Sequence, residues 1–380
     1  MRMPVSFLLL LALAAGPLAA QPKPGPPSPE VQKTIQSAFA KAQAGDVAGG
    51  IALLEPLKNS PGAHPAALSL LGTLYLQAGR PADALALLGP IADTGAAGPL
   101  ILHNAARAAL AVGEAARGEA YLRRAAAKAP DSLAARDLGL LLIGDGRLSE
   151  SYALLRPWAL AHPDDPDARL AAAFAAVELQ RAPEGEELLK GLPQDNPRVQ
   201  LLHARLLGLE NAPQAAVALL EPMLQNGPPE LLPEVRRNLA RLYMGTGRSQ
   251  KAAELLRGKT GDDPSLALLL GRAQYQTGDS AAAVESMAPF AKAALADPEP
   301  ADPSDRAAVA ELELEYGQAL LALSKWTDAM AALDLSTRLN PRSAQGWQLL
   351  SRAQLGAGQR DAAEKSMAKV KELKPKKPGG

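Results

Sequence analysis

The same kinds of residue recur at the same offsets in distant segments of this sequence, and this recurrence limits the fold more than any other feature. A segment beginning at Pro65 and a segment beginning at Ala344 place apolar, small and turn-forming residues at matching positions. In the first segment these residues are Leu68, Leu71, Gly72, Tyr75, Gly79, Ala84 and Leu88. In the second they are Trp347, Leu350, Ser351, Gln354, Gly358, Ala363 and Met367. A fixed spacing of this kind is typical of chains that stack one supersecondary unit on the next.

The pattern recurs along most of the chain, and apolar residues within each copy follow helical spacing. We count ten copies, which begin near residues 31, 65, 99, 132, 166, 197, 233, 264, 310 and 344. The copies at 31–64, 166–196 and 197–232 match weakly. Hydrophobic residues make up 47% of the chain but aromatic residues only 3%, so the core is built from Ala and Leu, which favour helices.

These copies resemble the tetratricopeptide repeat, a helix–turn–helix unit of ~34 residues. The resemblance covers about nine-tenths of the chain and implies an all-α fold, a right-handed superhelical solenoid of about ten repeats. Small residues at the eighth and twentieth repeat positions, such as Gly72 and Ala84, let the two helices of a repeat approach closely. The glycine between them supplies the turn, and stacking of repeats buries the apolar faces in one continuous core.

The chain divides into segments of different composition. Residues 1–20 have the basic residue, apolar run and small residues of a secretory signal peptide, with cleavage expected after Ala20. The alternative is an uncleaved membrane anchor, although the apolar run is shorter than the ~20 residues that span a bilayer. We therefore expect an exported, periplasmic protein without a membrane span in its mature form. The other expected segments are a Pro-rich spacer at 21–30, about eight repeats at 31–291, two further repeats at 310–373 and a basic, disordered tail at 374–380. Between the two groups of repeats, the Pro and Asp content of 292–309 predicts an extended second helix followed by a loop, which is either a hinge or a surface insertion.

Several classes of chemistry find no support in the sequence. Lys and Arg total 40, as do Asp and Glu, so the chain lacks the basic excess of a nucleic-acid-binding protein. It has no cysteine, and no two of its four histidines have a spacing that suits a metal ion. We expect no metal, no cofactor and no catalytic residues, with an enzyme of unrecognised site as the least favoured interpretation. The Asp-rich loops that precede Pro166 and Pro264 are expected to cap helices rather than to bind calcium.

The resemblance also implies where a partner would bind. In this family the first helices of the repeats line a concave groove, and repeat positions 2, 5, 9, 12 and 13 usually face it. Position 9 holds Arg107, Arg205, Arg241, Arg272 and Arg352, while position 5 holds His103, Arg136 and Arg237. Phe174 at position 9 and Tyr275 at position 12 add two aromatic rings.

An arginine-lined groove suits an acidic partner, because the planar guanidinium group binds carboxylates through two parallel hydrogen bonds. The hypothesis is that the groove binds an acidic peptide, a protein C-terminus or another polyanion. The alternative is that these arginines pair with neighbouring acids such as Glu234 and Glu311. A subset of the family binds chaperone C-termini through a two-carboxylate clamp, but the basic residues that this clamp needs around Asn104 and Asn238 are absent.

The family implies a non-catalytic scaffold or adaptor for protein–protein interactions, and the leader suggests a bacterial envelope, secretion or polysaccharide-export assembly. The alternative function is a carbohydrate- or polymer-binding accessory subunit. Such sites usually expose aromatic rings on one face, whereas Trp158, Trp326 and Trp347 do not form a row by repeat position. The sequence does not identify the partner or the oligomeric state.

Overall fold

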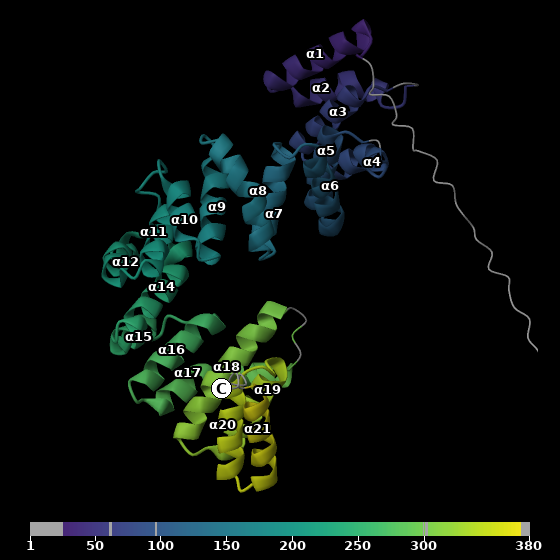
Figure 1. The fold of residues 1–380 in the computed structure, drawn as a ribbon. Coiled ribbons are helices and arrows are strands. Elements are labelled where there is room, and N and C mark those ends of the chain that lie inside the picture. The colour runs from purple at the N-terminus through teal and green to yellow at the C-terminus, as the bar shows by residue number, and fades with distance from the viewer. Residues whose placement is uncertain (1–25, 61–62, 96, 299, 301–302, 374–380) are drawn as a thin grey trace, which may run out of the picture. The chain divides into compact units, whose positions relative to one another are not determined.

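The computed structural model describes residues 26–60, 63–95, 97–298, 300 and 303–373 (Figure 1). The expected signal peptide, the first part of the expected spacer and the basic tail at 374–380 lie outside these residues. Every regular element among the described residues is a helix, which confirms the predicted all-α class. No helix in this part of the chain is long and apolar enough to cross a bilayer.

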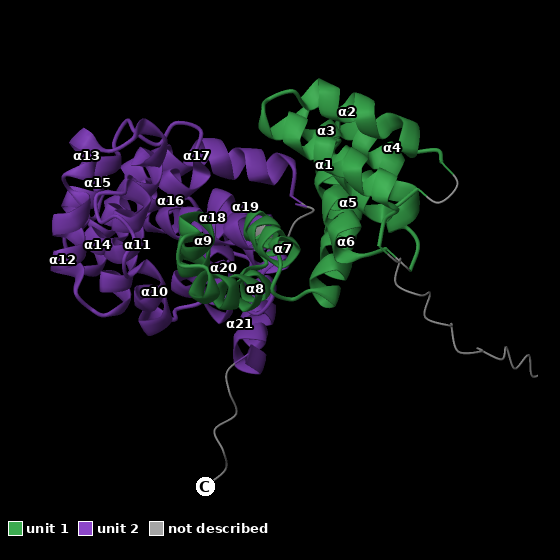
Figure 2. Ribbon diagram, turned by 90° about the horizontal axis from the view of Figure 1, so that it is seen from above, with its two compact units in different colours: residues 1–175 green, residues 176–380 purple. Residues whose placement is uncertain are grey.

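The chain forms two compact units, residues 1–175 and residues 176–380, and the boundary falls within one helix, α9 (Figure 2). Unit 1 contains helices that pair in sequence order, each first helix with the second helix that follows it. They are α1 Pro29–Gln43 with α2 Val47–Leu54, α3 Pro65–Gln77 with α4 Pro81–Ala92, α5 Pro99–Ala111 with α6 Ala115–Lys128, and α7 Leu133–Gly144 with α8 Leu148–Ala161. A short 3₁₀ turn, η1 Glu55–Leu57, extends α2, and most of α9 Pro166–Glu178 also belongs to unit 1.

Unit 2 continues the same pairing from the last residues of α9. Its pairs are α9 with α10 Ala182–Leu189, α11 Pro197–Leu209 with α12 Pro213–Leu220, α14 Leu232–Gly245 with α15 Ser249–Leu256, α16 Pro264–Gln276 with α17 Ser280–Ala296, α18 Pro303–Ala322 with α19 Trp326–Leu339, and α20 Ala344–Gly356 with α21 Arg360–Leu373. One-turn helix α13 Met223–Asn226 and the 3₁₀ turn η2 Pro229–Leu231 lie between α12 and α14. The described residues thus form ten helical hairpins, as the sequence predicted.

Local sequence signals explain where the hairpins begin. Many first helices start with proline, whose fixed φ suits the first helical turn and whose missing N–H would have no partner there. A preceding polar side chain caps the turn: Asp263 accepts hydrogen bonds from the N–H groups of Ser265 and Leu266, and Asp165 accepts one from Ala168. The prediction that these Asp-rich loops cap helices is therefore confirmed.

The turn within every hairpin has one left-handed residue, at repeat position 15 counted from the starts given above. Seven hairpins use glycine there: Gly45, Gly79, Gly113, Gly146, Gly247, Gly278 and Gly358. The other three use Gln180, Asn211 and Ser324, with φ of 58°, 58° and 57°. Two of these three hairpins are among those that match the repeat pattern weakly, so the fold is kept where the turn glycine is lost.

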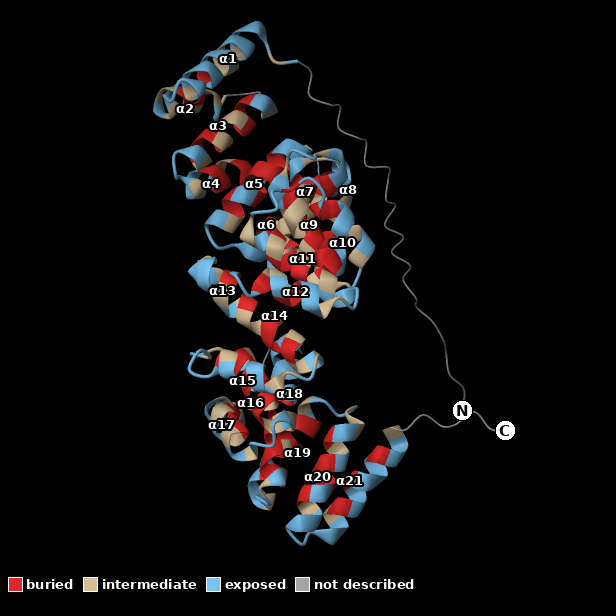
Figure 3. Ribbon diagram, turned by 90° about the vertical axis from the view of Figure 1, so that its left-hand side faces the viewer, coloured by how far each residue is buried: buried red, intermediate tan, exposed pale blue. Residues whose placement is uncertain are grey.

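Close packing within the hairpins depends on small residues at the eighth position. A Cβ atom on Gly139 would lie 2.5 Å from Cγ of Leu155, and one on Gly271 would lie 2.6 Å from Cγ of Met287. The predicted role of the eighth position is confirmed at both glycines, because a side chain there would have to displace Leu155 or Met287 of the second helix. Buried residues, mostly Ala and Leu, lie on the packed faces of the helices (Figure 3). Many of them belong to clusters that lie within a single unit, such as the cluster at 38–142 in unit 1 and those at 201–273 and 283–353 in unit 2.

The segment at 292–309 begins with an extended second helix, as the sequence predicted, since α17 runs to Ala296. The loop after it is shorter than expected, because α18 begins at Pro303 rather than near residue 310. The 20-residue α18 buries Ala310, Leu312 and Glu313 in unit 2, whereas residues 305–308 of its added turns are exposed. Pro90, Pro157 and Pro289 lie inside second helices.

Candidate partner-binding site

The ten predicted groove residues all lie on first helices, but the structure divides them between the two units. Unit 1 contains His103 and Arg107 on α5, Arg136 on α7 and Phe174 on α9. Unit 2 contains the remaining six, which are Arg205 on α11, Arg237 and Arg241 on α14, Arg272 and Tyr275 on α16, and Arg352 on α20. Each group is described separately below.

In unit 1 the polar residues form a closed network between neighbouring hairpins. Nε2 of His103 lies 2.8 Å from a carboxylate oxygen of Asp137, and Arg136 donates to Asp137 at 2.9 Å and to Asp165 at 2.7 Å. Trp158 donates from Nε1 to Asp165 at 2.9 Å. His103 is only 8% exposed, so neither it nor Arg136 is placed as a free ligand for a partner.

The network changes the acidity of its carboxylates. Burial acts to raise the pKa of Asp165, but hydrogen bonds from Arg136, the Ala168 N–H and Trp158 outweigh burial and lower this pKa to about 2. Burial also acts to raise the pKa of Asp137, and the hydrogen bonds from His103 and Arg136 again lower it below its usual value. Both carboxylates are therefore ionised at neutral pH and stabilise the basic groups beside them.

The other two predicted residues of unit 1 differ from each other. Arg107 is exposed and has no hydrogen bond or ion pair among the described residues. Phe174 is half-buried.

In unit 2 three of the predicted arginines are held by acids of neighbouring repeats. Arg205 pairs with Glu178 and lies 3.8 Å from Glu234. Arg237 donates to Asp263 at 2.8 Å and to the hydroxyl of Ser265 at 3.1 Å.

Arg272 donates to Glu311 at 2.7 Å and to Glu315 at 3.1 Å. For Arg205 and Arg272, the structure shows the pairing with Glu234 and Glu311 that the sequence left open as an alternative to partner binding.

Arg241 differs from these three, because it has no hydrogen bond or ion pair within the described residues and is exposed. Desolvation by the surrounding protein, followed by the positive charges of Arg237 and Arg205, lowers the pKa of Arg241 below its usual value. The distant carboxylates of Glu311 and Glu178 act in the opposite direction. An arginine nevertheless remains protonated at neutral pH. Arg241 therefore carries a positive charge near those of Arg237 and Arg205, and no acidic side chain pairs with it among the described residues.

A simple positional rule explains the difference. Both paired arginines at repeat position 9 have an acid at position 2 of the next repeat: Glu311 lies 2.7 Å from Arg272, and Glu234 lies 3.8 Å from Arg205, whose hydrogen-bonded partner is Glu178. After Arg241 this position holds Ser265, and after Arg107 it holds Leu133. The two arginines that lack an acid at this position are unpaired, and this signal is readable in the sequence.

A small cavity opens beside Arg241. Its volume is about 160 Å³, and Arg205, Asn238 and Arg241 contribute its polar lining. The rest of the lining is mainly apolar, from Val177, Leu209 and Leu242. Asn238 was considered in the sequence only as a possible clamp residue; its Nδ2 donates to the backbone oxygen of Glu234 at 2.9 Å.

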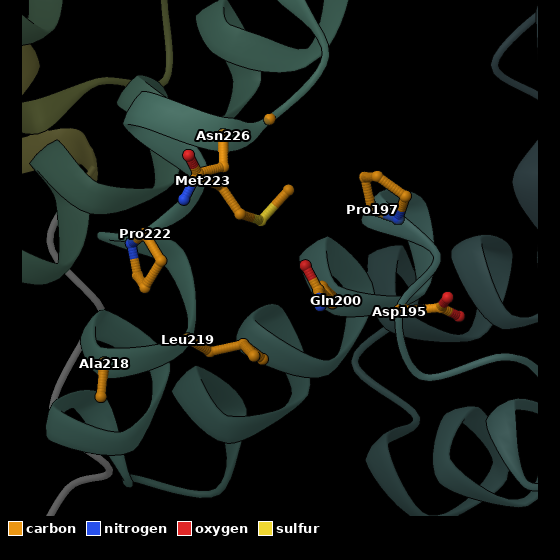
Figure 4. Close-up of a pocket in the computed structure, with 9 residues that line it drawn as sticks. Asp195, Pro197, Gln200, Ala218, Leu219, Pro222, Met223 and Asn226 are labelled. Carbon is orange, nitrogen blue, oxygen red and sulfur yellow. The ribbon is translucent and has the colours of Figure 1, made fainter.

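A larger hollow of about 360 Å³ lies elsewhere in unit 2, where α11 meets α12 and α13. Figure 4 shows Leu219 and Met223 facing Pro197 and Gln200 across it. Asp195 is its one ionisable lining residue, and no basic side chain lines it. This hollow therefore has no positively charged side chain that could bind a carboxylate of an acidic partner.

Two remaining predicted residues and the tryptophans have ordinary structural surroundings. Tyr275 is half-buried against the apolar cluster of residues 283–353, and Arg352 is exposed without an ion pair among the described residues. Trp158 is 9% exposed and stacks on His162 with ring centroids 3.8 Å apart. Trp326 and Trp347 pack against the same cluster as Tyr275, so the three tryptophans do not present a row of exposed rings.

The described residues contain no group of three or more His, Asp or Glu side chains that could hold a metal ion.

The fold and the candidate site together define an array of helical hairpins with a charged face on its first helices. Models of the tetratricopeptide repeat match residues 142–206, 237–305 and 344–377, so the chain carries tetratricopeptide repeats. A comparison with curated proteins found no match.

Three solved structures that are similar to the chain share 13–15% sequence identity with it. The Cut9–Hcn1 hetero-tetramer of the APC/C shares 13% identity over 91% of this chain and 81% of that chain, with a TM-score of 0.49. Human IFIT1 in a dimer with PPP-AAAA shares 14% identity over 89% of each chain, with a TM-score of 0.47. A structure of Naa15/Naa10 bound to HypK-THB shares 15% identity with this chain, with a TM-score of 0.40. The similarity covers 91% of this chain and 64% of that chain.

Proposed function

We propose that this protein is a non-catalytic scaffold or adaptor that binds acidic segments of other proteins through the first-helix face of unit 2. The observation that supports this most directly is Arg241, an exposed cation with no acid in hydrogen-bonding distance, beside Arg205 and Arg237. Tetratricopeptide repeats in three segments of the chain agree with such a role.

The charges around Arg241 favour an anionic partner over a neutral one. Arg237 and Arg205 destabilise the charge on Arg241, and a carboxylate brought by a partner would relieve that repulsion. A single exposed ion pair contributes little, typically ~0.2–1 kcal/mol, so useful affinity requires several contacts along the face. The arginines that already have acids would then orient Arg241 rather than bind the partner themselves.

We propose the bacterial envelope as the setting, in an export, secretion or polysaccharide-export assembly. The signal-peptide pattern of residues 1–20 supports this setting, and the absence of cysteine is compatible with it. A carbohydrate-binding function has no comparable support, since the three tryptophans are packed or half-buried.

The binding proposal is tested with a fluorescein-labelled, Glu-rich octapeptide whose C-terminus is amidated, and with the Gln version of the same peptide. Fluorescence anisotropy should show that the Glu peptide binds, that it weakens as salt rises, and that Arg241→Ala lowers its affinity several-fold. The matched control is Arg107→Ala, because Arg107 also occupies position 9 and is also unpaired, but belongs to unit 1. Equal binding of the Glu and Gln peptides, or an unchanged affinity in Arg241→Ala, would contradict the proposal.

The setting is tested separately. Cross-linking and affinity capture of the full chain from its native envelope, read by mass spectrometry, should recover a protein partner that is lost at high salt and in Arg241→Ala. Enrichment of glycan without protein would instead contradict the scaffold.

A further inference from the structure

The hollow where α11 meets α12 and α13 has the size and the lining of a binding site. Its volume of about 360 Å³ lies within the roughly 300–1,000 Å³ of pockets that hold ligands. Leu219 and Met223 face Pro197 across it, and Pro222 adds further apolar surface (Figure 4). An occupant of this hollow therefore contacts mainly apolar side chains.

The polar groups of the hollow are acidic or neutral. Asp195 is exposed, and its carboxylate has no hydrogen bond or ion pair among the described residues. Gln200 and Asn226 are amides, whose oxygens accept hydrogen bonds. Ala218 has a backbone oxygen without its helical donor, because residue 222 is a proline and has no N–H. The hollow thus presents hydrogen-bond acceptors and one negative charge.

The surrounding chain strengthens the preference for a positively charged occupant. The stretch 206–235, which contains α12 and α13, has no Lys or Arg. It has four acidic residues, Glu210, Glu221, Glu230 and Glu234. The C-terminal end of α12, at Leu220, adds the partial negative charge of its carbonyl groups. Arg198, the one basic residue next in sequence to a lining residue, is exposed on α11 and does not line the hollow.

Lysine has the two properties that this hollow requires. Its aliphatic stem lies on apolar surface while its ammonium group stays at the edge, and the ammonium donates three hydrogen bonds and accepts none. A proline beside the lysine adds apolar surface and lowers the conformational freedom that binding removes. Residues 374–380, Lys-Pro-Lys-Lys-Pro-Gly-Gly, contain three lysines and two prolines without an acidic residue.

The length of this segment indicates which copy of the chain supplies it. It follows α21, which is four hairpin steps beyond α13 along unit 2. Neighbouring helices pack about 8–10 Å apart, so four steps exceed the roughly 25 Å that seven extended residues span. A second copy of the chain is not limited in this way.

We propose that this hollow binds residues 374–380 of a second copy, with a lysine ammonium group on Asp195 and the aliphatic stem of that lysine between Leu219 and Met223. The contact uses a different surface on each copy, so it joins copies head to tail. It does not involve Arg241, and it is independent of the proposed function.

The first test uses the wild-type chain. Fluorescein-labelled Lys-Pro-Lys-Lys-Pro-Gly-Gly should bind the full chain at least tenfold more tightly, by fluorescence anisotropy, than the same peptide with Gln in place of each Lys. Asp195→Asn should lower the affinity for the Lys peptide several-fold, whereas Asp262→Asn, at an exposed acid outside the hollow, should not. Equal binding of the two peptides, or unchanged binding by Asp195→Asn, would overturn the proposal.

A second pair of variants fills the hollow without changing its charge. Ala218→Leu adds a larger side chain at an exposed position of α12 that lines the hollow, and Ala215→Leu makes the same change at an exposed position of α12 that does not. Only Ala218→Leu should lower the affinity for the Lys peptide several-fold. The same affinity in both variants would place the peptide elsewhere and overturn the proposal.

The assignment to a second copy is tested by disulfide trapping, because the chain has no cysteine of its own. Full-length Asn226→Cys and full-length Lys377→Cys, mixed under mild oxidation, should form a mixed dimer at least tenfold faster than Ala293→Cys with Lys377→Cys. Ala293 is exposed and occupies repeat position 30, as Asn226 does. Equal rates would overturn the proposal. A chain with cysteines at both 226 and 377 that closes on itself as a monomer would overturn the assignment to a second copy.

Discussion

The two units use the same helical hairpin, and in each of them paired charges on the first helices stand beside an arginine without an acid among the described residues, Arg107 in unit 1 and Arg241 in unit 2. In unit 1, Arg136 and His103 form a hydrogen-bonded network with Asp137 and Asp165. This network connects neighbouring hairpins, so Arg136 and His103 are not available to a partner. In unit 2, Arg241 projects from the same kind of helix with no acid to bind it. The comparison indicates that an arginine at repeat position 9 is available to a partner only when position 2 of the next repeat lacks an acidic residue.

The units also differ in how their buried acids respond to pH. The carboxylate of Asp165 in unit 1 is hydrogen-bonded and held below its usual pKa. Glu313 in unit 2 is 0% exposed, and neither of its carboxylate oxygens has a hydrogen-bond partner among the described residues. Burial raises the pKa of Glu313 to about 8. A fall in pH toward 2 should therefore weaken unit 1, and a rise in pH from 4.5 toward 8 should weaken unit 2.

The largest expected effect concerns Glu313. Its pKa rises on folding from 4.5 to about 8, so its protonated form stabilises unit 2 fully below pH 4.5, and that stability is lost as pH rises toward 8. The loss between pH 4.5 and pH 7 is about 3 kcal/mol, at 1.36 kcal/mol for each pH unit. Urea unfolding across this range should show the loss, and Glu313→Gln should remove it. Glu285→Gln, at an exposed position of α17, is the matched control; the same pH dependence in both variants would refute the assignment.

The second effect has the opposite sign and belongs to unit 1. The pKa of Asp165 falls on folding from 3.8 to about 2, so its contribution is fully present above pH 3.8 and disappears as pH falls toward 2. The contribution is about 2 kcal/mol. Hydrogen exchange of α7 and α9 peptides should show this loss in the wild type and not in Asp165→Asn. Asp164→Asn changes the adjacent, exposed carboxylate and should behave like the wild type.

A third, smaller effect concerns the hairpin turns. All four turns of unit 1 place glycine in the left-handed conformation, whereas unit 2 also uses Gln180, Asn211 and Ser324. A left-handed residue other than glycine costs ~1–2 kcal/mol, partly offset by the greater freedom of glycine in the unfolded chain. Gln180→Gly and Ser324→Gly should each stabilise the protein by about 0.5–1 kcal/mol in thermal unfolding. Gly79→Ser in unit 1 should have the reverse effect, and a stabilising Gly79→Ser would show that turn strain does not explain the difference.

Much of the fold could be predicted because the signals are local. Prolines at the first helical turn, capping side chains such as Asp263 and the small residues at position 8 set the ten hairpin starts closely. The ninth repeat keeps the register of its expected start near 310, with Gly317 at position 8 and Ser324 in the turn, but its first helix begins earlier, at Pro303.

The site was predictable only in part. The arginines at position 9 could be identified from the repeat pattern. Their pairing with Glu234 or Glu311 could also be predicted, because aligning the repeats shows which acidic residue lies two helices further along the chain, beside each arginine. The cavity beside Arg241 was not predictable, because it depends on how closely Leu209 and Leu242 approach across two helices. Glu313 gave no signal either, since a Glu on an amphipathic helix is ordinarily solvated.

The claim that a partner recognises an unpaired arginine is tested most directly by placing an acidic residue beside Arg241. In Ser265→Glu, a carboxylate occupies position 2 of the next repeat, where Glu311 pairs with Arg272. The amidated Glu-rich peptide should then bind several-fold more weakly than to the wild type, whereas Leu133→Glu, the equivalent change beside Arg107, should leave its binding unchanged. Full binding of the peptide by Ser265→Glu would contradict the claim that an unpaired arginine at this position is what a partner recognises.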